Sequence, residues 1–206
     1  KENPDFELAA QVHELQAMVR HLEAVQQMRN QENNRLAAGV PAGTVREMLQ
    51  EHLVFLDAQL ESLQQQIDEH IARHPVLQRQ SELLDSIPGI GKLTAAKLLG
   101  ENIQSFTSTR ALAAYAGLNP RHTESGSSVH GKPRLSKVGN QTLRKALYFP
   151  AISAKNHNPV ISAFCQRLAE RGKQKMVIVG AAMRKLLCLA LGVLKSGQPF
   201  DPNYLQ

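Results

Sequence analysis

The sequence predicts an all-α protein, in which a long helical coiled-coil hairpin precedes a compact helical domain with a glycine hairpin and a long basic loop. Three observations predict this architecture. Apolar residues recur at spacings of three and four along most of the chain. No stretch shows a convincing apolar–polar alternation, the pattern of a half-buried strand. Charge divides the chain, because residues 1–74 carry a net charge of −6 and residues 75–206 carry +12.

The charge division limits the partners of each part. Residues 1–74 hold 6 Lys+Arg against 12 Asp+Glu, whereas residues 75–206 hold 18 against 6. A concentrated positive excess indicates that only the second part approaches a polyanion. The chain has no Trp and 4% aromatic residues, which disfavours a base-stacking module for single strands. We therefore expect contacts to phosphate.

Cysteine spacing and hydropathy bear on the cellular setting. Cys165 and Cys188 lack a C-x-x-C spacing, which argues against a zinc site or a disulfide scaffold. The apolar run 176–194 is interrupted by Arg184 and Lys185, which argues against a membrane span. No signal-peptide pattern is present, so a cytoplasmic location is expected. Because the sequence opens at Lys1 with a helical pattern close behind, we also expect a fragment of a longer protein.

Residues 1–74 are expected to form the coiled-coil arm and to drive oligomerisation. Heptad-spaced apolar residues define one seam in about 4–36 and another from Leu49 to Ile71, separated by the breaker 39–43. The seams comprise Leu8, Val12, Leu15, Val19 and Leu22, then Leu49, Leu53, Leu56, Leu60, Leu63, Ile67 and Ile71. An antiparallel hairpin and an interchain bundle fit this pattern equally well. Two ordinary helices packed on the domain core remain the alternative.

Residues 75–206 are expected to form the second domain, with Pro75 at the boundary. Ser108 is a good N-cap for a helix over 109–117, where Gly117 suits the C-terminal stop. Further apolar stripes predict helices over 141–155, 160–172 and 175–195, the last being the most buried.

A glycine hairpin lies within residues 83–99, which read LLDSIPGIGKLTAAKLL. Helices over 76–86 and 92–99 would flank it, and Gly89 and Gly91 permit positive φ and close backbone approach. The unpaired N–H groups at the start of the second helix would suit a phosphate. The I-P-G-I-G core resembles the helix-hairpin-helix DNA-binding element, which implies that Lys92 and Lys97 face DNA backbone.

Residues 117–140 form a polar, glycine-rich and basic segment that is too hydrophilic to bury. A loop of this length inside a compact domain is usually functional or disordered, and its basic character favours function. The motif A-x-x-G-L-x-P-R leads into it from Ala114 to Arg121, S-G follows at 125–126, and L-S-K-x-G-N ends at Asn140.

The order and spacing of these motifs after the glycine hairpin resemble the C-terminal transposase domain of RNA-guided insertion-sequence recombinases, the bridge-RNA enzymes. The resemblance covers residues 83 to about 194. It implies that Ser125 of the S-G pair is a nucleophile toward a DNA phosphodiester, forming a phosphoserine intermediate for strand exchange. Ser127 and Ser128 are neighbouring alternatives. A serine hydroxyl needs a base, a metal or cations to stabilise its alkoxide.

Cations and histidines surround Ser125 in the sequence. Arg121, Lys132 and Arg134 are expected to clamp phosphate, the alternative being solvated loop charges. Lys137 and Asn140 either bind phosphate or cap the helix after Gly139, and the sequence does not choose between these roles. His122 and His130 lack metal-ligand spacing, so they are interpreted as loop polar groups or auxiliary phosphate donors.

The family resemblance also implies what lies elsewhere. Its four acidic residues, which bind Mg²⁺, belong to an RNase-H-like domain that would precede Lys1. The acidic residues after Pro75 are scattered, so no metal site is expected in this chain. The resemblance implies a bridge RNA that selects DNA, a dimer or tetramer assembled by the coiled coil, and no activity for these residues alone.

A second hypothesis from another class is a non-catalytic binding module. In it, the hairpin and loop hold DNA or structured RNA while the coiled coil recruits a partner. It accounts for the charges and heptads, and it predicts that replacing Ser125 by alanine changes no activity.

Overall fold

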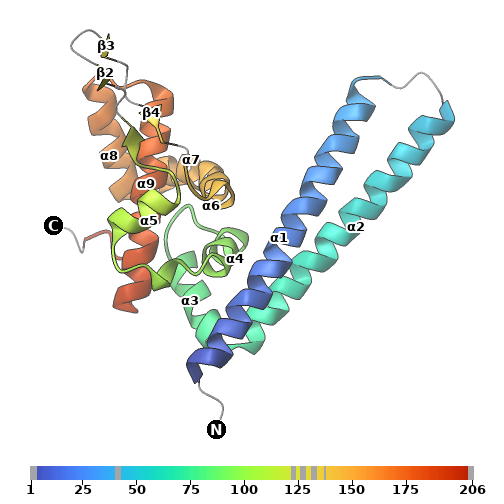
Figure 1. Cartoon of the computed structure of the whole chain (residues 1–206), viewed down its shortest axis with the longest axis horizontal. Helices are drawn as coiled ribbons and strands as arrows, with labels where there is room; N and C mark the ends of the chain where they lie inside the picture. The colour runs from blue at the N-terminus through green and yellow to red at the C-terminus, as the bar shows by residue number, and fades with distance from the viewer. Residues whose placement is uncertain are drawn as a thin grey trace. The chain divides into compact units, whose positions relative to one another are not determined.

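A computed structural model describes residues 4–39, 43–121, 124–125, 129–130, 134–136 and 138–203. The chain divides into two compact units, 1–78 and 79–206. The division falls inside α3 (Pro75–Asp85), whereas the sequence analysis placed the boundary at the start of this helix. The described elements are helices, apart from four two-residue strands, so the all-α class is confirmed (Figure 1).

Unit 1 is a hairpin of two long helices, α1 (Pro4–Ala37) and α2 (Gly43–Arg73) (Figure 1). Arg29 Nε lies 2.9 Å from the Asp57 carboxylate, and Nε2 of His70 lies 3.0 Å from the Gln11 carbonyl oxygen. These pairs join the late part of α1 to the middle of α2 and the early part of α1 to the end of α2. The helices therefore pack antiparallel, which is compatible with the coiled-coil interpretation.

The seam of unit 1 follows most of the predicted apolar positions. Its buried apolar residues on the two long helices are Val12, Leu15, Val19, Leu22, Val25, Leu56, Ile67 and Ile71. Val25 extends the seam of α1 by half a heptad beyond the predicted residues. The predicted seam leucines Leu49, Leu53, Leu60 and Leu63 are only half-buried. The seam is therefore closed most fully toward the end of α2.

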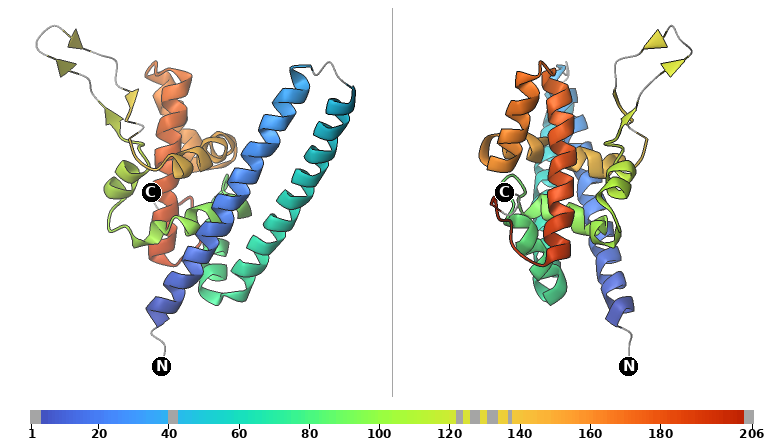
Figure 2. Two further views of the ribbon diagram at one scale, coloured as in Figure 1. Left: turned by 45° about the vertical axis from the view of Figure 1, so that its right-hand side comes forward. Right: turned by 90° about the vertical axis from the view of Figure 1, so that its left-hand side faces the viewer.

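Unit 2 is built around α9 (Lys175–Ser196), which packs against α5 (Thr109–Tyr115), α7 (Tyr148–His157) and α8 (Pro159–Glu170) (Figure 2). The unit also contains α4 (Lys92–Gly100), the 3₁₀ turn η1 (Ile103–Ser105) and α6 (Gln141–Ala146). Among the described residues, α9 is the one helix long and apolar enough to cross a membrane. Half of its most apolar window is nevertheless buried in the protein, as expected for the central helix of a domain.

Several helix ends form where the sequence indicates them. The Ser108 side chain accepts a hydrogen bond from Ala111 N and caps α5. Gly117, at φ +67°, ends that segment with hydrogen bonds from Gly117 N to Ala114 O and from Leu118 N to Ala113 O. This pair of bonds is a Schellman motif, which requires a left-handed residue.

The predicted single helix over 141–155 is wrong, because the chain forms α6 and α7 with a break at Leu147. Pro150 explains the break. Proline lacks an N–H group, and its ring would clash with the carbonyl four residues earlier, that of Ala146. Helix α6 ends at Ala146, and Pro150 lies in the first turn of α7, where its missing donor costs nothing.

The basic loop contains four two-residue strands, although no apolar–polar alternation indicates a strand there. β1 (Pro120–Arg121) pairs antiparallel with β4 (Arg134–Leu135), and β2 (Glu124–Ser125) pairs antiparallel with β3 (Val129–His130). The register places Arg121 opposite Arg134 and Ser125 opposite Val129. The four strands are hereafter called the ribbon, with the β1–β4 pair at its base and the β2–β3 pair beyond it. Both views of Figure 2 show β2 and β3 outside the helices of unit 2.

The two cysteines are free and provide a probe of this fold. Burial raises the pKa of Cys165, against the opposing effect of Lys155. Burial also raises the pKa of Cys188, although Arg184, a hydrogen bond with Thr109, and Lys185 each act to lower it. A raised thiol pKa stabilises the fold below the ordinary value of 9.0, and this stabilisation is lost as the pH rises through the folded-state pKa.

We therefore expect iodoacetamide to alkylate both thiols slowly in the native protein at pH 7.5, and much faster in denaturant. Mass spectrometry of time points would measure the two rates. Native alkylation of Cys165 at the rate of a free thiol would contradict the buried placement.

Candidate nucleic-acid interface

The hairpin between α3 and α4 depends on a glycine at position 89. Gly89 has φ +104°, and a Cβ there would lie 2.6 Å from the Cβ of Ala154 on α7. Ile87 and Ile90, on either side, are buried. Gly89 thus serves both a left-handed turn and a close approach between the hairpin and α7.

Two hydrogen bonds hold the hairpin from other parts of unit 2. Asn158 is fully buried, and its Nδ2 donates to Pro88 O at 3.4 Å while its Oδ1 caps α8. Phe200 N donates to Ser86 Oγ at 2.9 Å. The hairpin is therefore positioned by α7, by the α7–α8 junction and by the C-terminal segment.

Gly91 differs from Gly89 in conformation and surroundings. Its φ of −104° is an ordinary extended value, so of these two glycines Gly89 alone uses the positive φ that glycine permits. A Cβ on Gly91 would meet nothing within 4 Å. It is the N-cap of α4 without a side-chain hydrogen bond, and the first intrahelical bond runs from Ala95 N to Gly91 O. The earlier N–H groups of α4 have no intrahelical acceptor.

The two lysines of α4 lie in different surroundings. Lys92 is exposed at the open N-terminus beside Gly91. Lys97 is half-buried and already interacts within the chain. The exposed end of α4 therefore combines unpaired donors, the positive end of a helix dipole and the Lys92 ammonium, which together suit a phosphate.

The ribbon carries several of the predicted site positions. Ser125 is the last paired residue of β2, and Arg121 and Arg134 occupy opposed positions in the β1–β4 pair. For these three residues the backbone alone is described. Four predicted positions, with His122, lie outside the described residues: Ser127, Ser128, Lys132 and Lys137.

Both ends of the ribbon return to the last turn of α5. At the entry, Leu118 N bonds to Ala113 O. At the exit, Asn140 N donates to Tyr115 O at 2.6 Å. Gly139 has φ +133°, and a Cβ there would lie 2.2 Å from Tyr115 O, so glycine is required for this approach.

Asn140 is the centre of a polar cluster with Glu101 and Tyr115. Its Oδ1 accepts from Leu143 N at 2.8 Å and caps α6. Its Nδ2 donates to the Tyr115 hydroxyl at 2.8 Å and to the Glu101 carboxylate, which also accepts from Tyr115 Oη at 3.1 Å. The capping alternative for Asn140 is therefore confirmed. Sequence reasoning missed Glu101 and Tyr115, which lie 39 and 25 residues from Asn140.

The base of the ribbon is further fixed by packing. A Cβ on Gly180 of α9 would lie 3.0 Å from Cδ1 of Leu135, so this small residue admits the leucine of β4. Ser136 N donates to Asn119 O at 2.9 Å and continues the pairing below β4. Arg144 Nη1 donates to Ala116 O at 2.9 Å, which satisfies a carbonyl at the end of α5. The base of the ribbon is therefore held against α5 and α9.

Among the residues that the structure describes, no group of three His, Cys, Asp or Glu side chains could hold a metal ion. Glu101, the buried carboxylate nearest the ribbon base, is already engaged by Tyr115 and Asn140.

The segment that carries the hairpin and the ribbon is similar to a known protein family. Residues 81–166, which contain the hairpin, the ribbon and Asn158, match the family described as Transposase IS116/IS110/IS902 family. The pilin gene-inverting protein of Moraxella bovis is 41% identical over 143 residues, covering 68% of this chain and 44% of that protein.

Two further relatives are named for insertion elements. The insertion element IS110 43.6 kDa protein of Streptomyces coelicolor is 32% identical over 152 residues, covering 72% of this chain and 36% of that protein. The transposase for insertion sequence element IS1328 of Yersinia enterocolitica is 35% identical over 104 residues, covering 48% and 29%. The chain spans less than half the length of these relatives. Its hairpin and ribbon lie in a segment similar to the transposases of the IS116/IS110/IS902 family.

Proposed function

We propose that this chain is the coiled-coil and DNA-handling portion of an RNA-guided insertion-sequence recombinase, with Ser125 as the nucleophile. The observation that carries the proposal is the position of Ser125. It is the last paired residue of β2 on a ribbon whose two ends are fixed to α5, within the segment similar to transposases. A fixed base and a projecting strand end suit a nucleophile that must meet a scissile bond in line.

The proposed reaction exchanges one phosphate ester for another. Ser125 Oγ attacks the phosphorus, an Oγ–P bond forms, and the bond from phosphorus to one deoxyribose oxygen breaks. The hydroxyl proton of Ser125 leaves, and the departing deoxyribose oxygen gains a proton. Attack on the phosphoserine by a deoxyribose hydroxyl of another strand reverses these changes. No net energy source is needed, because an ester is present at every stage.

Charge supports the approach of DNA to these elements. Arg121 and Arg134 occupy opposed positions, where like charges destabilise a strand pair unless an anion lies between them. Lys92 and the N-terminus of α4 offer a second phosphate contact that reads backbone and not sequence. Lys132 and Lys137 are proposed to add to a phosphate contact made by Arg121 and Arg134, with His122 and His130 as auxiliary donors.

Two parts of the proposal rest on the motif resemblance alone. A bridge RNA selects donor and target DNA, and acidic residues that bind Mg²⁺ are supplied by an RNase-H-like domain outside these 206 residues. That metal would supply charge stabilisation at the scissile phosphate when bound. The proposed location is cytoplasmic.

Self-association through unit 1 is the remaining part of the proposal. Its support is the incompletely buried seam at Leu49, Leu53, Leu60 and Leu63. Val45, Met48 and Phe55 on α2 are also exposed, at 45%, 64% and 57%. Large apolar side chains along one helix favour packing against another helix, so a dimer or tetramer is expected.

Covalent trapping tests the nucleophile. The complete gene product, its RNA, Mg²⁺ and end-labelled DNA would be incubated and separated under denaturing conditions. Wild type is expected to yield a protein–DNA adduct with the label on the Ser125 peptide, and Ser125→Ala to yield none, a loss of more than 100-fold. Ser127→Ala and Ser128→Ala are matched controls that should retain the adduct.

Two outcomes would contradict the assignment. An adduct that survives Ser125→Ala but disappears in a control variant would move the nucleophile to that serine. Recombination that proceeds without an adduct and is unaffected by Ser125→Ala would make unit 2 a module that only holds DNA.

A further inference from the structure

A run of cations without acidic residues begins where the segment matched by the transposase family ends. From residue 171 to residue 200 the sequence contains six Lys or Arg and no Asp or Glu. Three of the six, Arg171, Lys173 and Lys175, lie together in the turn between α8 and α9, and Arg167 precedes them on the last turn of α8. We call these four residues the α8–α9 basic corner.

Hydrogen bonds give the corner a defined backbone. Arg171 N donates to Arg167 O at 3.3 Å, which places these two residues one turn apart on the same side of the helix end. Gly172, at φ +69°, reverses the chain through bonds from Gly172 N to Ala169 O and from Lys173 N to Leu168 O. Lys175 then begins α9, so the four cations are held within a single Schellman turn and its flanks.

The cations of the corner are open to solvent and are not neutralised by the described residues. Residues 169–177 are exposed without interruption. Glu170, the acidic residue in this stretch, accepts a hydrogen bond from Gln166 at 3.2 Å. Within the described ranges, no salt bridge joins any of the four cations to a carboxylate. Four neighbouring positive charges repel one another, and an external polyanion would relieve this repulsion.

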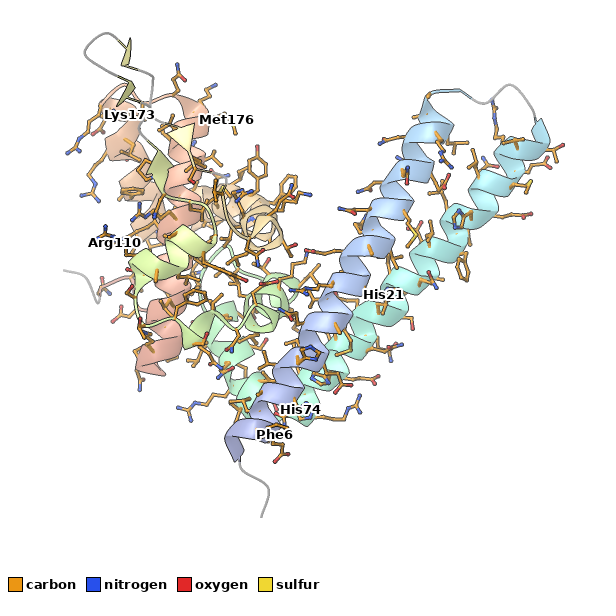
Figure 3. The ribbon with its side chains drawn as sticks, viewed as in Figure 1. Phe6, His21, His74, Arg110, Lys173 and Met176 are labelled. Atoms are coloured by element: carbon orange, nitrogen blue, oxygen red, sulfur yellow. The ribbon has the colours of Figure 1, made fainter. Side chains whose placement is uncertain are left out.

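The corner lies at the same end of unit 2 as the ribbon. Figure 3 labels Lys173 and Met176 at the end of α8 and α9 where β2 and β3 also lie, and both views of Figure 2 agree. The ribbon base reaches α9 through the contact of Leu135 with Gly180, one turn from Met176. The corner and the base of the ribbon therefore both adjoin α9.

We propose that the α8–α9 basic corner binds the phosphate backbone of duplex DNA flanking the strand engaged by the ribbon. The inference rests on the proposed function insofar as unit 2 must handle DNA, but it does not depend on Ser125. The corner has no aromatic side chain for stacking unpaired bases, which favours a duplex over single-stranded nucleic acid. Lysines and arginines on a turn contact phosphates without reading sequence.

The test measures the salt dependence of DNA binding. The complete protein with its RNA would be titrated with a labelled duplex at 50 to 300 mM salt, for wild type and for Arg171→Gln, Lys173→Gln and Lys175→Gln combined. Each lost phosphate contact lowers the slope of log K against log salt by about 0.9, so the triple variant is expected to lose roughly 2 to 3 units of slope and at least ten-fold in affinity. A matched control replaces Arg20, Arg35 and Arg46 of unit 1 by Gln, which removes the same charge.

The outcomes distinguish a failure of this proposal from a failure of the proposal that Ser125 is the nucleophile. With saturating DNA, the triple variant should still form the Ser125 adduct, whereas Ser125→Ala should keep the wild-type salt slope. An unchanged slope, or a change equal to that of the unit 1 control, would overturn the proposal that the corner binds duplex DNA. Weaker binding of the isolated RNA with unchanged binding of the duplex would overturn it too, since the corner would then be an RNA contact.

Discussion

Replacing Gly89 by alanine is expected to destabilise unit 2 by about 3 kcal/mol or more. The new methyl group would overlap Ala154, whose Cβ lies 2.6 Å from its position and whose backbone lies 2.8 Å away. Overpacking costs about 1–3 kcal/mol, and a left-handed φ adds about 1–2 kcal/mol for an L-residue. Thermal unfolding followed by circular dichroism should show a melting temperature lower by roughly 10 °C.

Gly91→Ala is the matched control, because its methyl group would enter open space at an ordinary φ. We expect an unchanged melting temperature. If a phosphate docks at the N-terminus of α4, the methyl group obstructs it and duplex affinity falls several-fold. Equal destabilisation by the two substitutions would refute the described hairpin, and unchanged affinity of Gly91→Ala would remove the phosphate contact at α4.

Asn140→Ala is expected to have the second large effect. It removes the cap of α6, worth about 1 kcal/mol, and leaves Glu101 with one fewer donor in a buried position, worth about 1–3 kcal/mol. Chemical denaturation should therefore show a loss of roughly 2–4 kcal/mol. Asn140 anchors the chain that leaves the ribbon to Tyr115. Adduct formation should therefore also fall more than ten-fold at a temperature where the variant is folded.

Asn140→Ser separates the two roles of this residue. Serine can cap α6 through its hydroxyl but cannot donate to Glu101 and Tyr115 as the amide does. We expect an intermediate loss of stability and a loss of adduct close to that of alanine. If stability and adduct fell in parallel across both variants, the cluster would serve folding alone.

Local signals in the sequence predicted much of the fold. The seam of α1 follows from heptad spacing, and the limits of α5 follow from Ser108 and Gly117, because caps and left-handed glycines act through neighbouring backbone groups. The division of residues 141–157 into α6 and α7 at Leu147 was also predictable from the sequence, because Pro150 cannot donate a hydrogen bond to the Ala146 carbonyl. It was missed because the apolar stripe continues across the break.

The parts of the site that sequence did not reveal depend on distant contacts. Gly89 and Ala154 are brought together by the packing of unit 2, and nothing near either residue indicates the other. In the sequence Glu101 is one of several scattered acidic residues, yet in the structure its carboxylate accepts hydrogen bonds from both Tyr115 and Asn140. The ribbon has paired segments of two residues, too short for periodicity to indicate a strand.

Because the chain entering and the chain leaving the ribbon are both held at the last turn of α5, the length of the ribbon can change without a change in the rest of unit 2. Lengthening a closed loop costs little, about 0.6 kcal/mol for each doubling, and here the closure is made by Gly117, Leu118 and Asn140 at the base. Residues inserted into or removed from the ribbon in pairs would therefore keep the register of the β1–β4 pair.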